Sequence, residues 1–300
     1  MSSHVPSLRQ LQYLVALYDH GHFGRAAAAC FVTQSTLSSG INDLERLLDT
    51  TLVERTKRFM RFTGVGEHMV ERARLLVRGA EDLAESVRAE SEPLSSDLRL
   101  AVIPTIAPFV LPRFLPKLQS DWPQVRLFLR ETSTPLALEA LHRGTIDCVL
   151  LALPYECGEV DVAEIAVEPL LLGLPGAEAD QLSKPVLAAD IDMERLLLLE
   201  DGNCLSGHVL AACERPEMRS DALMLGTSLH TLVQMIDHGF GLTLLPRMAV
   251  DAGILDGTNV VAQPLASELA MRRIALVWRK GSARARDYYL LAETIASVIG

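Results

Sequence analysis

The chain has 300 residues, which is too long for one compact core of typical size, so we expect two or three folding units. Hydrophobic residues make up 49% and charged residues 22%, with glycine and proline scattered along the chain, and this composition excludes a disordered or low-complexity protein. The net charge of −10 excludes a uniformly basic surface, but residues 1–63 hold seven Arg or Lys against five Asp or Glu, net +2, which leaves −12 for the rest.

Two helices are predicted at the start of the chain. Apolar residues recur at helical spacing from residue 8, and Gly21 ends the pattern because glycine readily adopts the conformation that closes a helix. The segment GRAAAACF then predicts a short helix whose small side chains let a neighbouring helix pack closely. The positions expected to face inward are Leu8, Leu11, Val15 and Tyr18 in the first helix and Phe23, Ala27 and Cys30 in the second.

A third helix, with one apolar and one polar face, is predicted in TQSTLSSGINDLERLLDT. Thr33 can cap its amino end. The apolar stripe consists of Leu37, Ile41, Leu44 and Leu48. The cap and the polar face consist of Thr33, Gln34, Ser35, Thr36, Ser38, Ser39 and Asn42. Short polar side chains on an exposed helix face can enter the major groove of DNA and form hydrogen bonds with base edges.

The next segment, LVERTKRFMRFT, predicts a two-stranded wing. Its basic residues are Arg55, Lys57, Arg58 and Arg61, whose charges suit DNA phosphates. A polar helix face or a charged hairpin alone is equally consistent with a solvated surface. Three helices followed by a basic hairpin favour an all-α winged helix-turn-helix over residues 1–63 that binds double-stranded DNA.

A long helix is predicted from Gly64 to Ser91, and residues 64–92 form the expected linker. Its apolar residues are spaced alternately by four and three, which is the heptad pattern of a coiled coil. The seam consists of Met69, Ala73, Leu76, Ala80, Leu83 and Val87. An amphipathic helix packed on its own core is the alternative. We favour a dimerising helix, because a helix-turn-helix needs two copies to cover two half-sites.

From residue 93 onward the pattern changes to alternating strands and helices. LRLAVIP, VRLFLRE and DCVLLALP predict strands, and residues 111–120 and 135–143 predict helices between them. A second set runs from EPLLLGLPG through RLLLLED and SLHTLVQMIDHG to GFGLTLLP, and ALVWRKG with a last helix closes the chain. The first set predicts a parallel α/β pattern. We therefore expect an α/β domain over 93–300 with two lobes and a cleft, lobe I at about 93–169 and 277–300 and lobe II at about 170–276.

The whole chain resembles the LysR-type transcriptional regulators. The resemblance lies in AAAACFVTQSTLSSGINDLERLLDTTLVERT at the amino end and in GFGLTLLP of the second lobe. It implies a winged helix-turn-helix, a dimerising linker helix and a regulatory domain folded like a periplasmic binding protein. It also implies a homotetramer that binds promoter DNA and works with RNA polymerase. The family's usual proline, glutamine and arginine are replaced by Ser35, Gly40 and Asn42, which puts the target sequence in doubt.

The segment LEDGNCLSGHVLAAC resembles the redox loop of the family members that sense hydrogen peroxide. This resemblance implies that Cys204 is the sensing thiol and Cys213 the resolving one. It also implies peroxide-binding or thiolate-stabilising roles for Thr105, Thr134, Asn203 and Arg279. Two departures are evident, because those members commonly carry a histidine where Asn203 stands, and an imidazole expected after the resolving cysteine is absent, with Leu223 in that region.

The cysteine chemistry can also be followed from the residues. Cys204 comes after the turn EDGN and is expected to open a helix, whose dipole favours the thiolate that peroxide oxidises to a sulfenic acid. If residues 204–213 are helical, nine residues at about 1.5 Å each separate the two cysteines by about 13 Å. A disulfide needs Cα atoms within about 7 Å, so bridging would require this segment to unfold. Gly202, Gly207 and Pro216 would ease that refolding.

Several readings stay open. Both cysteines can be ordinary buried thiols, and Cys148 and Cys157 are also nine apart, so spacing alone is weak evidence. A regulator that binds a small organic effector between the lobes, with Thr105 as a contact, is one alternative, and a thiol peroxidase or disulfide oxidoreductase is another. We expect no enzyme activity, because the amino-terminal DNA-binding module would then be unexplained.

The five cysteines include no CxxC pair and no Cys/His group at zinc spacing, so we expect no metal site and no cofactor. The start MSSHVPSLRQLQYLV lacks the pattern of a signal peptide, and no apolar run approaches the roughly 20 residues that span a bilayer. We therefore expect a cytoplasmic protein without a membrane partner, with thiols kept reduced until a signal oxidises them and reset by a thiol reductant.

Overall fold

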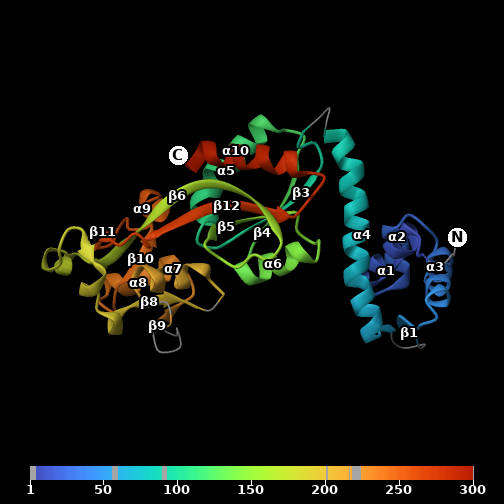
Figure 1. The fold of residues 1–300 in the computed structure, drawn as a ribbon, viewed down its shortest axis with the longest axis horizontal. Helices are drawn as coiled ribbons and strands as arrows, with labels where there is room; N and C mark the ends of the chain where they lie inside the picture. Colours follow the sequence, from blue (N-terminus) through green and yellow to red (C-terminus); the bar gives the residue numbers. More distant parts are fainter. Residues whose placement is uncertain are drawn as a thin grey trace. The chain divides into compact units, whose positions relative to one another are not determined.

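The computed structural model describes residues 5–55, 60–89, 93–200, 202–215, 217 and 224–299. It contains two compact units, Met1–Arg88 and Ala89–Gly300 (Figure 1). The finer division at residues 63 and 92 stays a prediction. None of the helices among the described residues combines the length and the apolar character needed to cross a membrane.

The first unit contains the expected three-helix domain with a two-stranded wing, followed by the long helix α4. Its elements are α1 (Leu8–His20), α2 (Phe23–Ala29), α3 (Gln34–Leu47), β1 (Val53–Arg55), β2 (Met60–Phe62) and α4 (Gly64–Ala89). α1 begins with a capping box between Ser7 and Gln10 and ends at Gly21, which has a φ of 60°. β1 and β2 pair antiparallel, and the wing residues Lys57 and Arg58 lie outside the described residues.

The core of this unit corrects one expectation about α1. The stripe on α3 is buried at Leu37, Ile41 and Leu44, as the spacing predicts. On α1, by contrast, Leu14 and Leu17 are fully buried while Leu8 and Tyr18 are exposed. α1 carries more apolar residues than one face needs, so the packing of α2 and α3 selects which of them turn inward.

The second unit is an α/β domain whose regular elements run from residue 97 to residue 299. Its helices are α5 (Ala107–Asp121), α6 (Thr134–His142), α7 (Cys204–Ala212), α8 (Leu229–Asp237), α9 (Arg247–Asp251) and α10 (Ala285–Ile299). Its strands are β3 (Asp97–Val102), β4 (Arg126–Glu131), β5 (Cys148–Leu153), β6 (Val160–Pro175), β7 (Val186–Leu187), β8 (Leu197–Leu199), β9 (Met224–Gly226), β10 (Thr243–Pro246), β11 (Val260–Ala266) and β12 (Met271–Arg279). Three short 3₁₀ turns cover Gly176–Gln181, Ala188–Asp190 and Met193–Arg195.

The sheet of this domain is mixed: the first set of strands is parallel, as the pattern predicts, whereas strands from later in the chain run antiparallel. The strand order is β4-β3-β5-β12-β6-β11-β7, and β10 pairs with β6. β3 is parallel to β4 and β5, but β12 is antiparallel to both β5 and β6. Figure 1 shows β6 and β12 as long strands that run side by side from one lobe into the other. β6 carries the chain from the first lobe into the second, and β12 carries it back. Local sequence patterns do not reveal this pairing.

Two hydrophobic cores define the two lobes. The first is built from residues between 94 and 163, together with Cys204 and residues 274–295. The second lies between residues 170 and 270. The first core therefore takes in β12 from Ile274, three residues ahead of the expected boundary at 277. α7 contributes to both cores, which makes it the element that matters most for the thiols.

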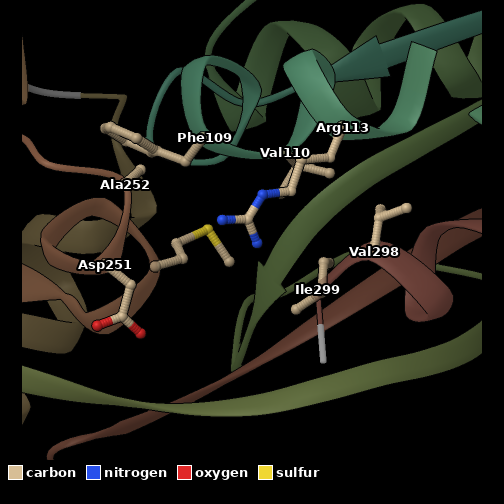
Figure 2. Close-up of a pocket in the computed structure, with 8 residues that line it drawn as sticks. Phe109, Val110, Arg113, Asp251, Ala252, Val298 and Ile299 are labelled. Atoms are coloured by element: carbon tan, nitrogen blue, oxygen red, sulfur yellow. The ribbon is translucent and has the colours of Figure 1, made fainter. Parts of the chain in front are cut away.

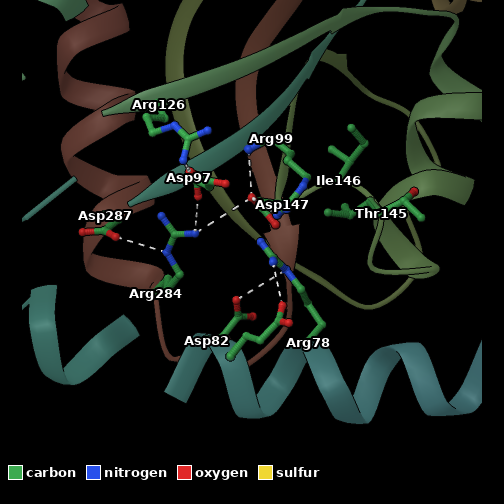
Figure 3. A network of polar contacts seen from close by, with 12 residues as sticks. Arg78, Asp82, Asp97, Arg99, Arg126, Thr145, Ile146, Asp147, Arg284 and Asp287 are labelled. Atoms are coloured by element: carbon green, nitrogen blue, oxygen red, sulfur yellow. Dashed lines mark hydrogen bonds and ion pairs between the residues drawn. The ribbon is translucent and has the colours of Figure 1, made fainter. Parts of the chain in front are cut away.

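A buried ionic cluster fastens the start of α10 to the first lobe (Figure 3). The fully buried Arg284 donates from Nε to Asp287 at 3.2 Å and from one terminal nitrogen to the carbonyl of Asp97 at 3.0 Å. The same guanidinium lies 3.9 Å from Asp147, whose carboxylate accepts the backbone N–H of Arg99 at 2.8 Å. Each charge in this cluster has a partner of opposite sign, as burial requires.

Candidate functional site

The polar face of α3 is open to solvent in the first unit. The exposed members of the expected set are Thr33, Gln34, Ser35, Thr36, Ser39 and Asn42. Thr33 Oγ1 accepts the N–H of Thr36 at 3.2 Å and so caps the helix. Because the cap occupies Thr33, the side chains best placed to reach a groove are those further along the helix, with Gln34 at its first turn.

The wing is fixed to α3 by a carboxylate. Glu45 accepts the backbone N–H groups of Leu52 and Val53 at 2.8 and 2.9 Å. Arg55 donates to Glu45 at 3.2 Å and to Ser38 at 3.1 Å. Two of the expected DNA contacts, Arg55 and Ser38, therefore bond each other, whereas Arg61 on β2 is exposed.

The linker helix α4 has two apolar faces, which revises the expected single seam. Val70, Ala73 and Val77 are buried in the core of the first unit, so Ala73 belongs to that core. Leu76 and Leu83, by contrast, are 62% and 63% exposed. The outer apolar row is therefore Leu76, Leu83 and Val87. Large exposed apolar side chains in a row are typical of a surface that another chain covers.

The two expected redox cysteines lie at the two ends of α7. Cys204 is its first residue and Cys213 caps its carboxyl end, and both are free thiols with exposed fractions of 6% and 3%. They belong to different cores, Cys204 to the first lobe and Cys213 to the second. Burial raises the pKa of Cys213 to about 11, so this thiol stays protonated while the helix is closed.

The amino end of α6 lies against the turn that precedes Cys204. A Cβ at Gly202 would come within 3.6 Å of Ser133, the residue before α6. The next residue, Thr134, is fully buried, and its hydroxyl has no hydrogen-bond partner among the described residues. Asn203 does not cap α7 with its side chain; its Nδ2 donates to the backbone carbonyl of Glu200 at 3.0 Å.

Thr105 is held by a buried ion pair. Arg272 on β12 donates to Thr105 Oγ1 at 3.0 Å and to its carbonyl at 3.1 Å. The same guanidinium lies 2.6 Å from Glu168 on β6, and both side chains are almost completely buried. Glu168 also accepts the backbone N–H of Met248 at 2.9 Å. This network ties β6, β12, α9 and the turn before α5 together near the crossing between the lobes.

Arg279, the expected charge partner of the sensing thiol, lies elsewhere. It donates to the carbonyls of Leu141 and Ile146 at 3.1 and 2.8 Å, at the opposite end of α6 from Thr134. Carbonyls at a helix carboxyl end are a favourable place for a cation. The guanidinium that contacts Thr105 is therefore that of Arg272, seven residues earlier on the same strand.

His208 is a residue that sequence reasoning missed. It lies one helical turn after Cys204 on α7, is 5% exposed, and its Nε2 donates to the carbonyl of Pro154 at 2.8 Å. Nδ1 is buried and has no hydrogen-bond partner within the described part of the chain. Burial lowers the pKa of His208, and the nearby charge of Arg272 lowers it further. The i, i+4 spacing from Cys204 was the signal that could have revealed it.

The other three cysteines differ in burial and in their contacts. Cys157 is nearly buried and its thiol donates to the carbonyl of Tyr155 at 3.3 Å. Cys148 lies within β5, and burial raises its pKa well above the usual value. Cys30, expected to face inward, is half-buried at the end of α2. Across the described ranges, no three His, Cys, Asp or Glu side chains are grouped as metal ligands would be.

A separate cavity of about 170 Å³ lies between the lobes, lined by α5, α9 and α10. Figure 2 shows Arg113 of α5 reaching into it, with Phe109 and Asp251 at its edge. Its lining is Phe109, Val110, Arg113, Met248, Asp251, Ala252, Val298 and Ile299. Neither Thr105 nor Cys204 contributes to this lining, so the cavity is distinct from the thiol site.

Comparison with known proteins agrees with this architecture. Residues 8–67 match the family model "Bacterial regulatory helix-turn-helix protein, lysR family", and residues 91–299 match "LysR substrate binding domain". The chain is 40% identical over 294 residues to "HTH-type transcriptional regulator EstR" of Acinetobacter baylyi, covering 98% of this chain and 97% of that one. It is 38% identical over 289 residues to "Hydrogen peroxide-inducible genes activator" of Escherichia coli O157:H7, covering 96% and 94%.

A solved structure is also similar over most of its length. Full-length OxyR from Pseudomonas aeruginosa, carrying a cysteine-to-aspartate substitution, matches with a TM-score of 0.76 at 29% identity. The match covers 96% of this chain and 94% of that one. The order of a helix-turn-helix, a linker helix and a two-lobed α/β domain is therefore shared with a solved OxyR structure.

Proposed function

Because this chain belongs to the LysR family of bacterial transcriptional regulators, we propose that it switches transcription in response to hydrogen peroxide, which it senses through Cys204 and Cys213. The genes under its control are then those of oxidative-stress defence. We infer a cytoplasmic regulator with no catalytic turnover of its own. Similarity to a hydrogen peroxide-inducible activator supports peroxide as the signal. EstR is just as similar, and its name mentions no peroxide. The proposal therefore depends on the chemistry of the two thiols.

One observation carries it: the two thiols occupy opposite ends of one helix and are buried in different cores. A helix of nine residues with its cap keeps the two Cα atoms about 13 Å apart, well beyond the limit of about 7 Å for a disulfide. A bond between Cys204 and Cys213 therefore requires α7 to open. Such an opening removes packing from both lobes at once, which is how a local oxidation changes a whole domain.

The chemistry proceeds in two steps. The Cys204 thiolate attacks one oxygen of hydrogen peroxide, so that a sulfur–oxygen bond forms, the oxygen–oxygen bond breaks, and hydroxide leaves to become water. The Cys213 sulfur then attacks the sulfenic sulfur, releasing a second water and leaving a disulfide. While α7 is closed, Cys213 is protonated and buried, so the second step waits for the helix to open. A thiol reductant returns both cysteines to the reduced form.

The DNA-binding side of the proposal assigns direct base contacts to the exposed face of α3, led by Gln34 and Asn42, and phosphate contacts to the wing. Two copies joined through α4 would present two such helices to adjacent half-sites. The exposed apolar row of Leu76, Leu83 and Val87 supports this dimer. Pairing of dimers into a homotetramer, and contact with RNA polymerase, complete the proposed assembly.

A competing function is a regulator that binds a small organic effector. The cavity lined by α5, α9 and α10 favours it, because Arg113 offers a cation to an anionic ligand between the two lobes. In that case both cysteines of α7 would be dispensable for the response.

A thiol peroxidase is distinguished by turnover, since it would consume many equivalents of peroxide per chain instead of one.

The deciding experiment maps the thiols by mass spectrometry after a stoichiometric dose of hydrogen peroxide, with DNA footprinting in parallel. We expect a Cys204–Cys213 disulfide in the unmodified chain, no response in Cys204→Ser, and a trapped sulfenic or mixed-disulfide species at Cys204 in Cys213→Ser. Cys30→Ser is the control, because it removes a free thiol from the first unit, outside the domain that holds α7. If Cys204→Ser still changed its DNA footprint normally after peroxide, the peroxide-sensor proposal would be wrong and the effector-binding regulator would be favoured.

A further inference from the structure

We propose that His208 is a peroxide-binding residue, whose Nδ1 accepts a hydrogen bond from the O–H group of hydrogen peroxide beside Cys204. This inference rests on the proposed function and adds a binding residue to it. Its starting point is an imidazole nitrogen that is buried and has no partner among the described residues.

The position of His208 follows from helical geometry. Residues four apart on a helix lie on the same face, about 5–6 Å from one Cβ to the other, and their side chains lean towards the amino end. The side chain of His208 therefore leans towards Cys204 at the start of α7. Both residues are buried, so neither side chain faces solvent.

The hydrogen bond to Pro154 fixes which nitrogen of His208 carries the proton. A carbonyl can only accept, so Nε2 donates to Pro154 at 2.8 Å and Nδ1 of the neutral ring is left as an acceptor. Burial and the charge of Arg272 both lower the pKa of His208, so the ring is neutral at neutral pH. An uncharged acceptor is then available at the pH at which the thiol reacts.

A second buried polar atom near Cys204 also lacks a partner in the described structure. It is Oγ1 of Thr134, at the amino end of α6, which lies against the turn before Cys204. Buried polar atoms without partners are unusual, and two near one thiol indicate a site for a small polar ligand. Hydrogen peroxide has two O–H donors and accepts on both oxygens. In the proposed site one molecule therefore bonds Nδ1 of His208 and the hydroxyl of Thr134.

In this arrangement His208 orients the hydrogen peroxide and neither gains nor loses a proton. The sulfur of Cys204 attacks the oxygen whose O–H group Nδ1 holds, forming the sulfur–oxygen bond as the oxygen–oxygen bond breaks. The second oxygen leaves as hydroxide and becomes water by taking a proton from solvent, while the sulfur is oxidised to the sulfenic level. The ionisable groups around the site are Arg272 of β12 with its partner Glu168 of β6, and Tyr155 and Cys157 after β5.

Two variants separate the roles of the two ring nitrogens. His208→Gln can keep a donor to Pro154 but offers no acceptor at the position of Nδ1. His208→Asn has an amide oxygen at the position of Nδ1 and loses the donor to Pro154. Rate constants for Cys204 would be measured in the full-length chain with hydrogen peroxide, trapping the sulfenic acid with dimedone, and separately with iodoacetamide.

We expect His208→Gln to lower the peroxide rate constant about tenfold, the loss of one oriented hydrogen bond, and to change the iodoacetamide rate constant less than about twofold. His208→Asn should recover most of the peroxide rate. In the unmodified chain the ratio of the two rate constants should fall only once the pH reaches the lowered pKa of His208, below the ordinary value of 6.5, because protonation removes the acceptor. His208→Gln should lack this fall. Because iodoacetamide also reacts with the thiolate, dividing by its rate constant removes the effect of the changing thiolate fraction at each pH.

An unchanged peroxide rate in His208→Gln would overturn the role of His208 and leave the peroxide sensor standing. Equal losses with peroxide and iodoacetamide, in both variants, would mean that His208 only supports the fold, and this would also overturn the inference. If peroxide does not oxidise Cys204 in the unmodified chain, the proposed function itself fails. The three outcomes are therefore distinguishable in one set of rate measurements.

Discussion

Replacing Gly207 by alanine should slow closure of the Cys204–Cys213 disulfide without slowing the first oxidation of Cys204. Gly207 lies inside α7, and an added Cβ there would meet no atom within 4 Å. Alanine should therefore stabilise the closed helix by about 0.5–1 kcal/mol, because glycine loses more backbone freedom on forming a helix. If the disulfide forms only after α7 opens, the open population and the rate of closure should fall about two- to fivefold.

The assay follows both steps after one equivalent of hydrogen peroxide. Samples quenched over time would be analysed by mass spectrometry for dimedone-trapped sulfenic acid and for the disulfide. Gly79→Ala in α4 is the matched control, since a Cβ there also meets no atom within 4 Å but the helix plays no part in the thiol reaction. An unchanged rate of disulfide formation in Gly207→Ala, or an equal slowing in Gly79→Ala, would refute the requirement that α7 opens.

Four further variants test the site and the fold. Arg61→Ala should weaken binding to all DNA sequences alike and lower the slope of log affinity against log salt concentration by about one unit. Gln34→Ala should instead change sequence preference at one base pair. DNA titrations at several salt concentrations measure both effects. Leu83→Asp should dissociate the native oligomer in sedimentation, because it would bury a charge at an apolar contact. Glu168→Ala should destabilise the second unit by about 3–5 kcal/mol in thermal unfolding, since Arg272 would remain buried without its partner; loss of less than 1 kcal/mol would mean that the pair is solvated.

Local patterns in the sequence determined much of this protein. The spacing of Leu37, Ile41 and Leu44 fixed the buried face of α3, and the alternation of strands and helices from residue 97 to 153 predicted β3, β4 and β5 with the helices between them. These features depend on neighbours within one or two turns, so a short window of sequence contains the information. The same holds for Cys204 at the start of a helix and Cys213 at its end.

The tertiary structure decided what depends on residues far apart in the chain. The antiparallel return of β12 beside β5 and β6 gives the sheet its mixed order, and it brings Arg272, not Arg279, to Thr105. The partner of His208, the carbonyl of Pro154, is 54 residues away in sequence. The packing of the whole domain selects which strands pair and which of several arginines becomes buried. The unpartnered Nδ1 of His208 could therefore be recognised only once that packing was known.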